Sequence, residues 1–354
     1  MEYIFEDVLE IKNGKNQKAV ENSEGLYPIY GSGGVMGYAD DYICDADTVI
    51  IGRKGNINNP IYVNERFWNV DTAFGLSAKR ELLLPRYLFY FCKKFDFEKL
   101  NKTVTIPSLT KSDLLKIKID LPVISEQQDV VDRLSKIEAV IELRKQKLSA
   151  LDDLIKARFV EMFGDPIANS KGWDIVELGE LTYIGSSKRI FEKEYVSEGI
   201  PFYRTKEIVE LSKGNSVSTE LFITEERFAE IKEKYGAPKA GDLLISAVGT
   251  IGVIWIVDGK NDFYFKDGNL IRVDGSEKFN SVYMKNLLEY LIDRYKKQMS
   301  TGTAYAALTI SGLTKMKVYD IPMELQNKFA DFVHQVDKSK FEELKVFNLK
   351  QKIR

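Results

Sequence analysis

A glycine-rich run near the start of the chain is the first segment whose residues could do chemistry. Gly31-Ser32-Gly33-Gly34-Val35-Met36-Gly37 could wrap its backbone N–H groups around a phosphate. A nucleotide-binding P-loop needs Lys and then Ser or Thr after its last glycine, whereas a dinucleotide-binding loop must open a helix. Tyr38-Ala39-Asp40-Asp41 follows instead, so neither motif is complete. The run predicts a tight loop, which either presents its backbone to DNA or is a purely structural turn.

A second segment comes close to a catalytic motif. Asn59-Pro60-Ile61-Tyr62 differs in one residue from the Asn-Pro-Pro-Tyr element with which adenine methyltransferases hold their target amine. Such an enzyme would also need a glycine-rich S-adenosylmethionine loop and a catalytic domain upstream. Too few residues precede Asn59 to hold that domain, and no Phe-x-Gly-x-Gly occurs. We therefore expect a strand that leaves a turn here, and not a catalytic site.

The residue types of other catalytic and metal sites are scarce or scattered. His334 is the only histidine, and Cys44 and Cys92 are the only cysteines, without the spacing of metal ligands. Adjacent acids occur in different predicted contexts, where solvated surface is the better interpretation: Asp40-Asp41, Asp152-Asp153 and Glu225-Glu226. We expect no catalytic residue, no metal ion and no cofactor on this chain.

Composition places the chain among ordinary globular proteins. Its 354 residues suffice for two domains, and the hydrophobic share of 44% is enough for packed cores. No apolar run approaches the ~20 residues that cross a bilayer, and the chain opens with acidic residues, so we expect a cytoplasmic protein. A net charge of −2 argues against nonspecific coating of nucleic acid but leaves room for a local basic patch.

Basic and small polar residues in predicted loops could form such patches. Arg and Lys bind phosphates, and Arg, Asn, Gln, Ser and Thr also read base edges. The candidates in the first part of the chain are Lys15, Lys18, Ser32, Arg53, Lys54, Asn56, Lys79, Arg80 and Thr105. Those in the second part are Lys188, Arg189, Arg204, Thr205, Lys206, Lys266, Thr301 and Thr303. For each lysine the alternative is an ordinary solvated side chain.

An internal repeat organises these candidates. Residues 106–122 (IPSLTKSDLLKIKIDLP) match residues 305–322 (YAALTISGLTKMKVYDIP), and a helix is predicted after each copy. Upstream the match continues more weakly: 27–30 with 200–203, 47–55 with 242–249, and 5–9 with 173–178. The chain therefore predicts two copies of one module.

A long helix should follow the first module. From Val130 the apolar residues step by four and three, the 3.5-residue period of a coiled-coil seam: Val130, Leu134, Ile137, Ile141, Leu148, Leu151 and Ile155, with Arg144 as the one break. Gly164-Asp165-Pro166 should stop this helix. A single apolar stripe needs a partner, and the C-terminal segment offers Phe329, Val333 and Val336. The two helices could pair antiparallel, or each could pack on the core of its own module.

The modules themselves read as mixed structure. Short β-branched and aromatic runs predict strands at 48–51, 61–63, 243–245, 253–257 and 270–273. Short helices are expected at 85–95, 225–235 and 281–297. The expected fold class is α/β (α+β), with two similar mixed domains and long helices that form an antiparallel coiled coil. We place the modules at 1–122 and 166–321 and the helices at 123–165 and 322–354.

These stretches resemble a known family. IPSLTKSDLLKIKIDLPVISEQQDVV (106–131), the seam helix and FVEMFGDP (159–166) resemble the central conserved region of the specificity subunits of type I restriction-modification systems. YPIYGSGGVMGYAD (27–40) and IPFYRTKEI (200–208) resemble conserved stretches of that family's target recognition domains. The resemblance covers essentially the whole chain, but the second helix is shorter than the central one and lacks a second FGDP ending.

The resemblance implies a DNA-binding protein without catalysis. Each target recognition domain would read one half of a bipartite DNA site. The helices would set the gap between the halves and dock two methyltransferase (modification) subunits, which restriction (motor-nuclease) subunits can join. S-adenosylmethionine, ATP and Mg²⁺ would belong to those partners. The repeat and the seam fit equally well a coiled-coil adaptor that binds proteins, and a steep salt dependence would distinguish DNA binding from it.

Overall fold

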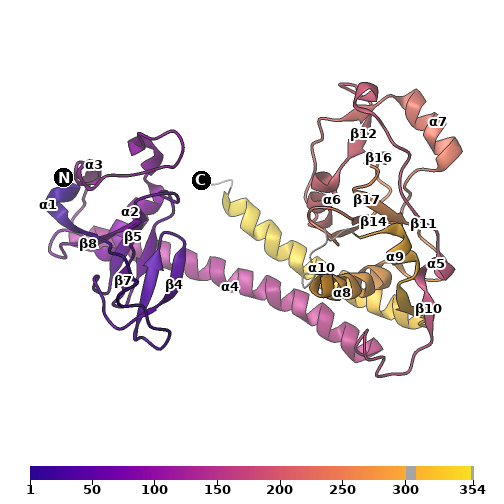
Figure 1. Cartoon of the computed structure of the whole chain (residues 1–354), viewed down its shortest axis with the longest axis horizontal. Coiled ribbons are helices and arrows are strands. Elements are labelled where there is room, and N and C mark those ends of the chain that lie inside the picture. The colour runs from indigo at the N-terminus through magenta and orange to yellow at the C-terminus, as the bar shows by residue number, and fades with distance from the viewer. Residues whose placement is uncertain (300–307, 352–354) are drawn as a thin grey trace. The chain divides into compact units, whose positions relative to one another are not determined.

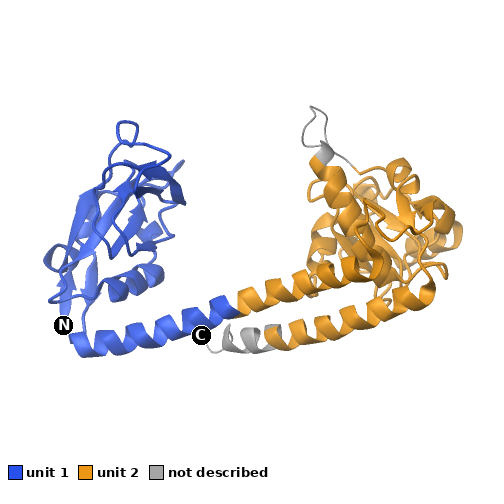
Figure 2. Ribbon diagram, turned by 90° about the horizontal axis from the view of Figure 1, so that it is seen from below, with its two compact units in different colours: residues 1–143 blue, residues 144–354 orange. Residues whose placement is uncertain are grey.

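The computed structural model describes residues 1–299 and 308–351, with backbone alone at 298–299 and 344–351. It divides into two compact units, residues 1–143 (unit 1) and residues 144–354 (unit 2), which are coloured separately in Figure 2. No helix among the described residues is long and apolar enough to span a membrane.

Unit 1 is built on two small sheets (Figure 1). The four-stranded antiparallel sheet has the order β2-β8-β5-β6, from β2 Leu9–Asn13, β5 Thr48–Gly52, β6 Ile61–Val63 and β8 Ala73–Ala78. In the three-stranded sheet, β3 (Tyr27–Gly31) pairs antiparallel with β4 (Gly34–Ala39) and parallel with β7 (Trp68–Asn69). A further strand pair, β1 (Glu2–Ile4) with β9 (Lys118–Asp120), ties the start of the module to its end.

Unit 2 repeats this arrangement strand for strand. Its sheets have the orders β11-β17-β14-β15 and β13-β12-β16, and a separate pair joins β10 to β18. The strands are β10 Ile175–Glu177, β11 Ile184–Gly185, β12 Ile200–Tyr203, β13 Phe222–Ile223, β14 Leu243–Ser246, β15 Ile254–Ile256, β16 Tyr264–Phe265, β17 Leu270–Val273 and β18 Lys317–Tyr319. β12 pairs with β16 in parallel, as β3 does with β7. The predicted duplication is therefore present in the topology.

Only some of the short helices are repeated between the two units. Unit 1 contains α1 Phe5–Val8, α2 Pro85–Lys94, the 3₁₀ helix η1 Phe97–Leu100 and α3 Lys111–Leu115. Unit 2 contains α5 Leu178–Leu181, η2 Glu192–Glu194, α6 Thr205–Ser212, α7 Glu225–Tyr235, α8 Ser281–Met299 and α9 Ile310–Thr314. The longer of these helices bury an apolar stripe, such as Leu88, Phe89 and Cys92 of α2, and this periodicity is why α2, α7 and α8 were predictable.

One detail of the sequence alignment of the two copies is wrong. Phe5 corresponds to Leu178 and not to Trp173, because each of the two follows the strand that pairs with β9 or β18 and opens a short helix. Trp173 serves another purpose, since its indole N–H donates to the carbonyl of Phe163 at 2.8 Å. The aromatic side chain therefore belongs to the end of the central helix and not to the repeat.

Two long helices follow the modules, α4 (Ile124–Phe163) and α10 (Met323–Gln351). Each contains a buried glutamine in its first turn. Gln127 donates to the carbonyls of Leu82 and Pro122 and accepts the backbone N–H of Leu84 at 2.9 Å. Gln326 accepts the N–H of Asn280 in the same way. These bonds fasten the start of each long helix to the start of α2 or α8, because they satisfy buried backbone groups there.

Within unit 2, α4 and α10 pair antiparallel. Phe329, near the start of α10, packs against Phe159 and Phe163 near the end of α4, with ring centroids 5.4 and 5.5 Å apart. Further along, Lys340 pairs with Asp152, and Glu343 with Lys147 at 2.5 Å. The antiparallel arrangement is therefore confirmed. The helix pair also contributes to the core of unit 2, which includes Ile155, Val333 and Val336 together with residues of the sheet and α8.

The seam is not buried evenly along α4. Ile155 is 7% exposed, whereas Val130 and Ile137, which lie in unit 1, are 38% and 45% exposed. Leu134, Ile141, Leu148 and Leu151 are half-buried. Arg144, the break in the apolar series, donates to the backbone carbonyl of Glu343 at 3.4 Å. Arg144 can therefore occupy a seam position, because its guanidinium bonds to the backbone of α10.

The FGDP segment ends α4 by capping it. Gly164 has φ +81°, a conformation that favours glycine, and its N–H bonds to the carbonyl of Val160. The carboxylate of Asp165 accepts the N–H groups of Ile167 and Ala168, which holds the pKa of Asp165 below its usual value. The stop predicted from the sequence is therefore a bonded turn.

Candidate nucleic-acid interface

Several predicted candidates of unit 1 meet where β5 ends. The loop of residues 53–57, which we call strand-end loop 1, begins at Arg53 and is held from two sides. The N–H of Arg53 donates to the carbonyl of Thr72 at 2.7 Å, and its carbonyl accepts the N–H of Leu109 at 2.9 Å. The N–H of Gly55 donates to the carbonyl of Pro107 at 2.9 Å, which brings the segment that contains Thr105 to the same end of the unit.

Ser32 belongs to this same end. Ser32 and Gly33 form the turn between β3 and β4, so the glycine-rich run is a β-hairpin and not a phosphate loop. The amide of Asn56 donates to the carbonyl of Ser32 at 3.5 Å, and Arg53, Lys54 and Asn56 are all exposed. Two cations, an amide and a hydroxyl thus share one open edge, which suits both phosphate and base contacts.

Lys15 adjoins this edge, and Lys18 does not. The N–H of Lys15 donates to the carbonyl of Asn69 at 2.9 Å, next to the segment that contains Thr72. Lys18 lies in a turn that pairs with the far end of β4, where the N–H of Asp40 donates to the carbonyl of Val20. Lys18 is therefore separated from Ser32 by the length of that strand.

Lys79 and Arg80 lie at the opposite end of the β5–β8 pair. Lys79 donates to the carbonyls of Glu6 and Asp7, and Arg80 forms a 2.6 Å ion pair with Asp47. Tyr62 donates to the same carboxylate at 2.5 Å. The bonds from Tyr62 and Arg80 hold the pKa of Asp47 below its usual value. Both cations therefore have structural partners, and the structure does not bring them to strand-end loop 1.

The Asn-Pro-Ile-Tyr segment is structural, as predicted. Its tyrosine, Tyr62, lies in β6 and makes the bond to Asp47 described above. Both cysteines are buried, and burial raises the pKa of Cys44 to about 12, so this thiol is un-ionised at neutral pH. His334 is an exposed residue of α10.

In unit 2 the predicted cations gather around the ends of the parallel strands β12 and β16. Arg204 and Lys266 follow these two strands directly, and the N–H of Lys266 donates to the carbonyl of Tyr203 at 2.9 Å. Arg189 forms a 2.7 Å ion pair with Asp267, and Lys188 donates its N–H to the hydroxyl of Tyr264. We call Lys188, Arg189, Arg204, Thr205, Lys206 and Lys266 the basic cluster of unit 2.

This cluster has unused hydrogen-bonding capacity. Among the described residues, the buried hydroxyls of Ser187 and Thr205 have no hydrogen-bond partner. Arg204 is held by the buried carboxylate of Glu207 at 3.0 Å, which raises the pKa of its guanidinium. Buried polar groups are normally paired, so this edge is suited to a polar ligand.

The loop of unit 2 that corresponds to strand-end loop 1 was not among the predicted candidates. Residues 247–251, which we call strand-end loop 2, follow β14 as residues 53–57 follow β5. The carbonyl of Ala247 accepts the N–H of Leu308 at 3.2 Å, the counterpart of the bond between Arg53 and Leu109. The match between Gly55 and Gly249 was the available signal. Thr301 and Thr303 lie outside the described residues.

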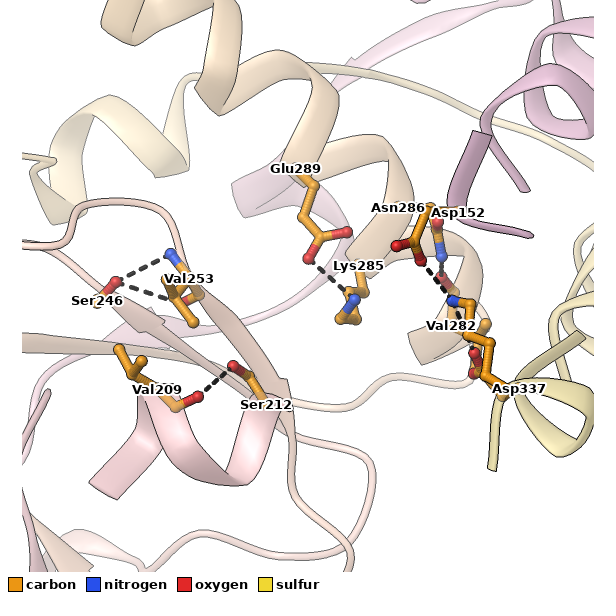
Figure 3. A network of polar contacts seen from close by, with 11 residues as sticks. Asp152, Val209, Ser212, Ser246, Val253, Val282, Lys285, Asn286, Glu289 and Asp337 are labelled. Carbon is orange, nitrogen blue, oxygen red and sulfur yellow. Dashed lines mark hydrogen bonds and ion pairs between the residues drawn. The ribbon is translucent and has the colours of Figure 1, made fainter. Parts of the chain in front are cut away.

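Unit 2 also contains an open groove. It has a volume of about 730 Å³ between α4, α8 and α10, with Ile155, Phe159 and Val333 among its apolar lining residues. Charged residues surround this floor: Asp152, Lys156, Lys285, Glu289, Asp293, Arg294, Lys297, Asp337 and Lys340. Figure 3 shows the ion pair of Lys285 with Glu289, at 2.9 Å, and Asp152 and Asp337 nearby.

The fold and these clusters define a class of protein: a duplicated α/β module with a basic, polar edge on each copy and long helices that follow each copy. The chain belongs to the family of the type I restriction modification DNA specificity domain, whose family model matches residues 2–153 and 170–353. It is thus the DNA specificity subunit of a type I restriction-modification system, which is a non-catalytic subunit.

Individual relatives agree with this assignment. A candidate type I restriction enzyme specificity subunit of Haemophilus influenzae is 28% identical over 345 residues, which cover 94% of this chain and 86% of the relative. The MjaIX specificity subunit of Methanocaldococcus jannaschii is 26% identical over 310 residues, or 80% of this chain and 68% of that protein.

Two solved structures share the fold. The S subunit of a type I restriction-modification system from M. genitalium superimposes with a TM-score of 0.61 at 18% identity, over 100% of this chain and 93% of that one. A chain from a study of complex assembly and conformational transition of a type I system gives 0.57 at 17% identity, over 100% and 95%.

Proposed function

We propose that each unit reads one half of a bipartite DNA site. The observation that carries this proposal is the paired strand-end loops. Gly55 and Gly249 have nearly the same left-handed φ, 77° and 74°, and each accepts the N–H of the residue two places on at 3.0 Å. Loop 1 contains Arg53 and Lys54, and the N–H of Ala247 in loop 2 donates to the carbonyl of Asn269 at 2.8 Å, three residues after Lys266 of the basic cluster. One chain that presents the same loop twice in this way is suited to two separate contacts with one DNA duplex.

The chemistry of each edge fits DNA. Phosphate contacts come from exposed cations, such as Arg53 in unit 1 or Lys188 and Lys206 in unit 2, and these contacts position the protein. Thr205, whose buried hydroxyl has no partner within the described part of the chain, is suited to a polar group of the ligand. The low net charge of the whole chain is then no obstacle, because only the edges that face DNA must be basic.

We further propose that the helices set the gap between the half-sites. In this division of the chain, residues 123–165 and 322–354 are the spacer, and residues 1–122 and 166–321 are the target recognition domains. α4 is one unbroken helix of 40 residues, and its second half is braced by α10. A braced helix resists bending, so its length can act as a fixed measure.

The partners would then carry the chemistry. We propose that two modification (methyltransferase) subunits dock on the long helices and that restriction subunits join them, in the cytoplasm. The groove between α4, α8 and α10, with an apolar floor and a charged rim, has the composition of a protein docking surface. S-adenosylmethionine, ATP and Mg²⁺ would bind to those subunits.

DNA binding by the purified complex of this chain with its modification subunit tests the proposal. We expect steep salt dependence, and about tenfold weaker binding for Arg53→Ala and for Arg204→Ala, because each removes a charged contact. Lys94→Ala, an exposed lysine of α2, is the matched control and should bind as the unsubstituted chain does. Binding that is insensitive to salt and to both arginines would instead favour an adaptor that binds proteins.

A further inference from the structure

The two strand-end loops have the same backbone but different side chains. Both start at a strand end, both have a left-handed glycine at the third position, and both are anchored by an N–H to the first carbonyl. At the second and fourth positions, loop 1 has Lys54 and Asn56, whereas loop 2 has Val248 and Thr250. All four of these side chains are exposed.

The backbone of each loop is also held by the last residue of the preceding strand, and the contact differs between the two units. In unit 1 the carbonyl of Asn56 folds back over Gly52, so closely that a Cβ on Gly52 would lie 2.1 Å from the oxygen. In unit 2 the place of Gly52 is taken by Ser246, which is fully buried. Its hydroxyl donates to the carbonyl of Thr250 and accepts the N–H of Val253 at 2.9 Å, as Figure 3 shows for the latter.

In each unit, then, the carbonyl of the fourth residue is turned inward, and its side chain is left outside. A loop with a constrained backbone holds its side chains in place before binding, which reduces the entropy lost when they contact a ligand. Constant backbone with variable side chains is the arrangement expected where two copies of one module must recognise different targets.

We propose that the second and fourth residues of the strand-end loops select bases, and that they do so differently in the two half-sites. This inference rests on the proposed function. Lys54 and Asn56 offer hydrogen-bond donors; lysine pairs with guanine O6 and N7, and asparagine with adenine N6 and N7. Val248 offers only apolar contact, which suits the methyl group of thymine, and Thr250 adds a hydroxyl. Unit 1 therefore selects a purine through loop 1, and unit 2 selects thymine through loop 2.

Exchange of the loop side chains tests this assignment. The variant K54V/N56T places the side chains of loop 2 on the backbone of loop 1, and V248K/T250N is the reciprocal change. Each full chain is expressed with its modification subunit, and the methylation motif is read by sequencing of methylated DNA. The control K94V/N64T makes the same two substitutions at exposed positions elsewhere in unit 1.

We expect K54V/N56T to change one or two base positions in one half-site, with at least a tenfold change in the preference at that position. The other half-site and the gap should persist, which also shows that the complex has folded. V248K/T250N should alter the opposite half-site, and the control should alter neither.

Three outcomes would overturn the inference. The first is an unchanged motif at full efficiency, and the second is a change in both half-sites at once. The third is a uniform loss of binding to all sequences together with a shallower salt slope, which would make Lys54 a phosphate contact. The proposed function fails separately, if the unsubstituted chain directs methylation to no bipartite motif.

Discussion

Lys340 of α10 forms a 2.6 Å ion pair with Asp152 of α4 and also pairs with Asp337, one turn earlier in its own helix. Its side chain is only 20% exposed. Burial by itself would lower the pKa of Lys340, but the bonds to the two carboxylates raise it above its usual value. This lysine therefore links the antiparallel helices of unit 2 as a permanent cation.

A double-mutant cycle on this pair measures how much it contributes to the helix pairing. We expect a coupling free energy between D152A and K340A of ~0.5–1 kcal/mol, since Asp152 is largely exposed and water screens the charge. The coupling should shrink as salt is added. A coupling of zero at low salt would mean that the ion pair of Lys340 with Asp152 does not stabilise the helix pairing.

Phe329 provides the larger share of that pairing. Its side chain is fully buried against Phe159 and Phe163, so Phe329→Ala should destabilise unit 2 by about 3–5 kcal/mol in chemical denaturation. Phe341, on the same helix and 62% exposed, is the matched control, and Phe341→Ala should change stability by less than ~0.5 kcal/mol. Equal effects of the two substitutions would contradict the described packing.

Asp47 should make the stability of unit 1 dependent on pH in the acidic range. Its pKa in the folded chain is lowered, above all by the hydrogen bond from Tyr62, and the unfolded value is about 3.9. The stabilisation is therefore present above about pH 4 and is lost as the pH falls through the folded pKa. Asp47→Asn should lower the free energy of unfolding by about 1 kcal/mol at pH 7. It should also reduce the further loss of stability as the pH falls.

Asparagine suits this test because residue 47 has φ 63°, which asparagine tolerates. Asp45→Asn is the control, because the side chain of Asp45 is 60% exposed. Melting curves between pH 3 and pH 7 give the comparison, and parallel pH profiles for both variants would rule out the proposed role of Asp47.

The length of α4 should determine the gap in the DNA site. Seven residues inserted after Val140, before Arg144 and its bond to Glu343 of α10, would add ~10.5 Å of helix. At 3.4 Å per base pair, the gap should grow by up to about three base pairs. The motif of the insertion variant, with its modification subunit, gives the answer. A folded and active variant with an unchanged gap would show that the helices do not measure the site.

Sequence reasoning found most of the elements, because each depends on local periodicity. β5 is buried at all five positions and appears in the sequence as an apolar run, and the stop at Gly164 follows from glycine and proline chemistry. The pairing of α4 with α10 followed from an apolar stripe that had to be covered.

The candidate DNA-binding site was harder to predict from the sequence, because it depends on contacts between distant segments. Nothing local distinguishes Arg53, which faces the open edge, from Arg80, which is held by Asp47. Val248 was not predicted as a site residue because it is neither basic nor polar, although the repeat aligns its loop with the loop that contains Lys54. Only the tertiary hydrogen bonds, such as the one from Leu308 to Ala247, make the equivalence plain.

The methylation motif tests the central claim most directly. Cells that express this chain together with its modification subunit should carry methylated adenines in one motif that has two specified parts and an unspecified gap of fixed length. A single undivided motif, with an active modification subunit verified in the same cells, would contradict the account of two units that each read one half of the DNA site.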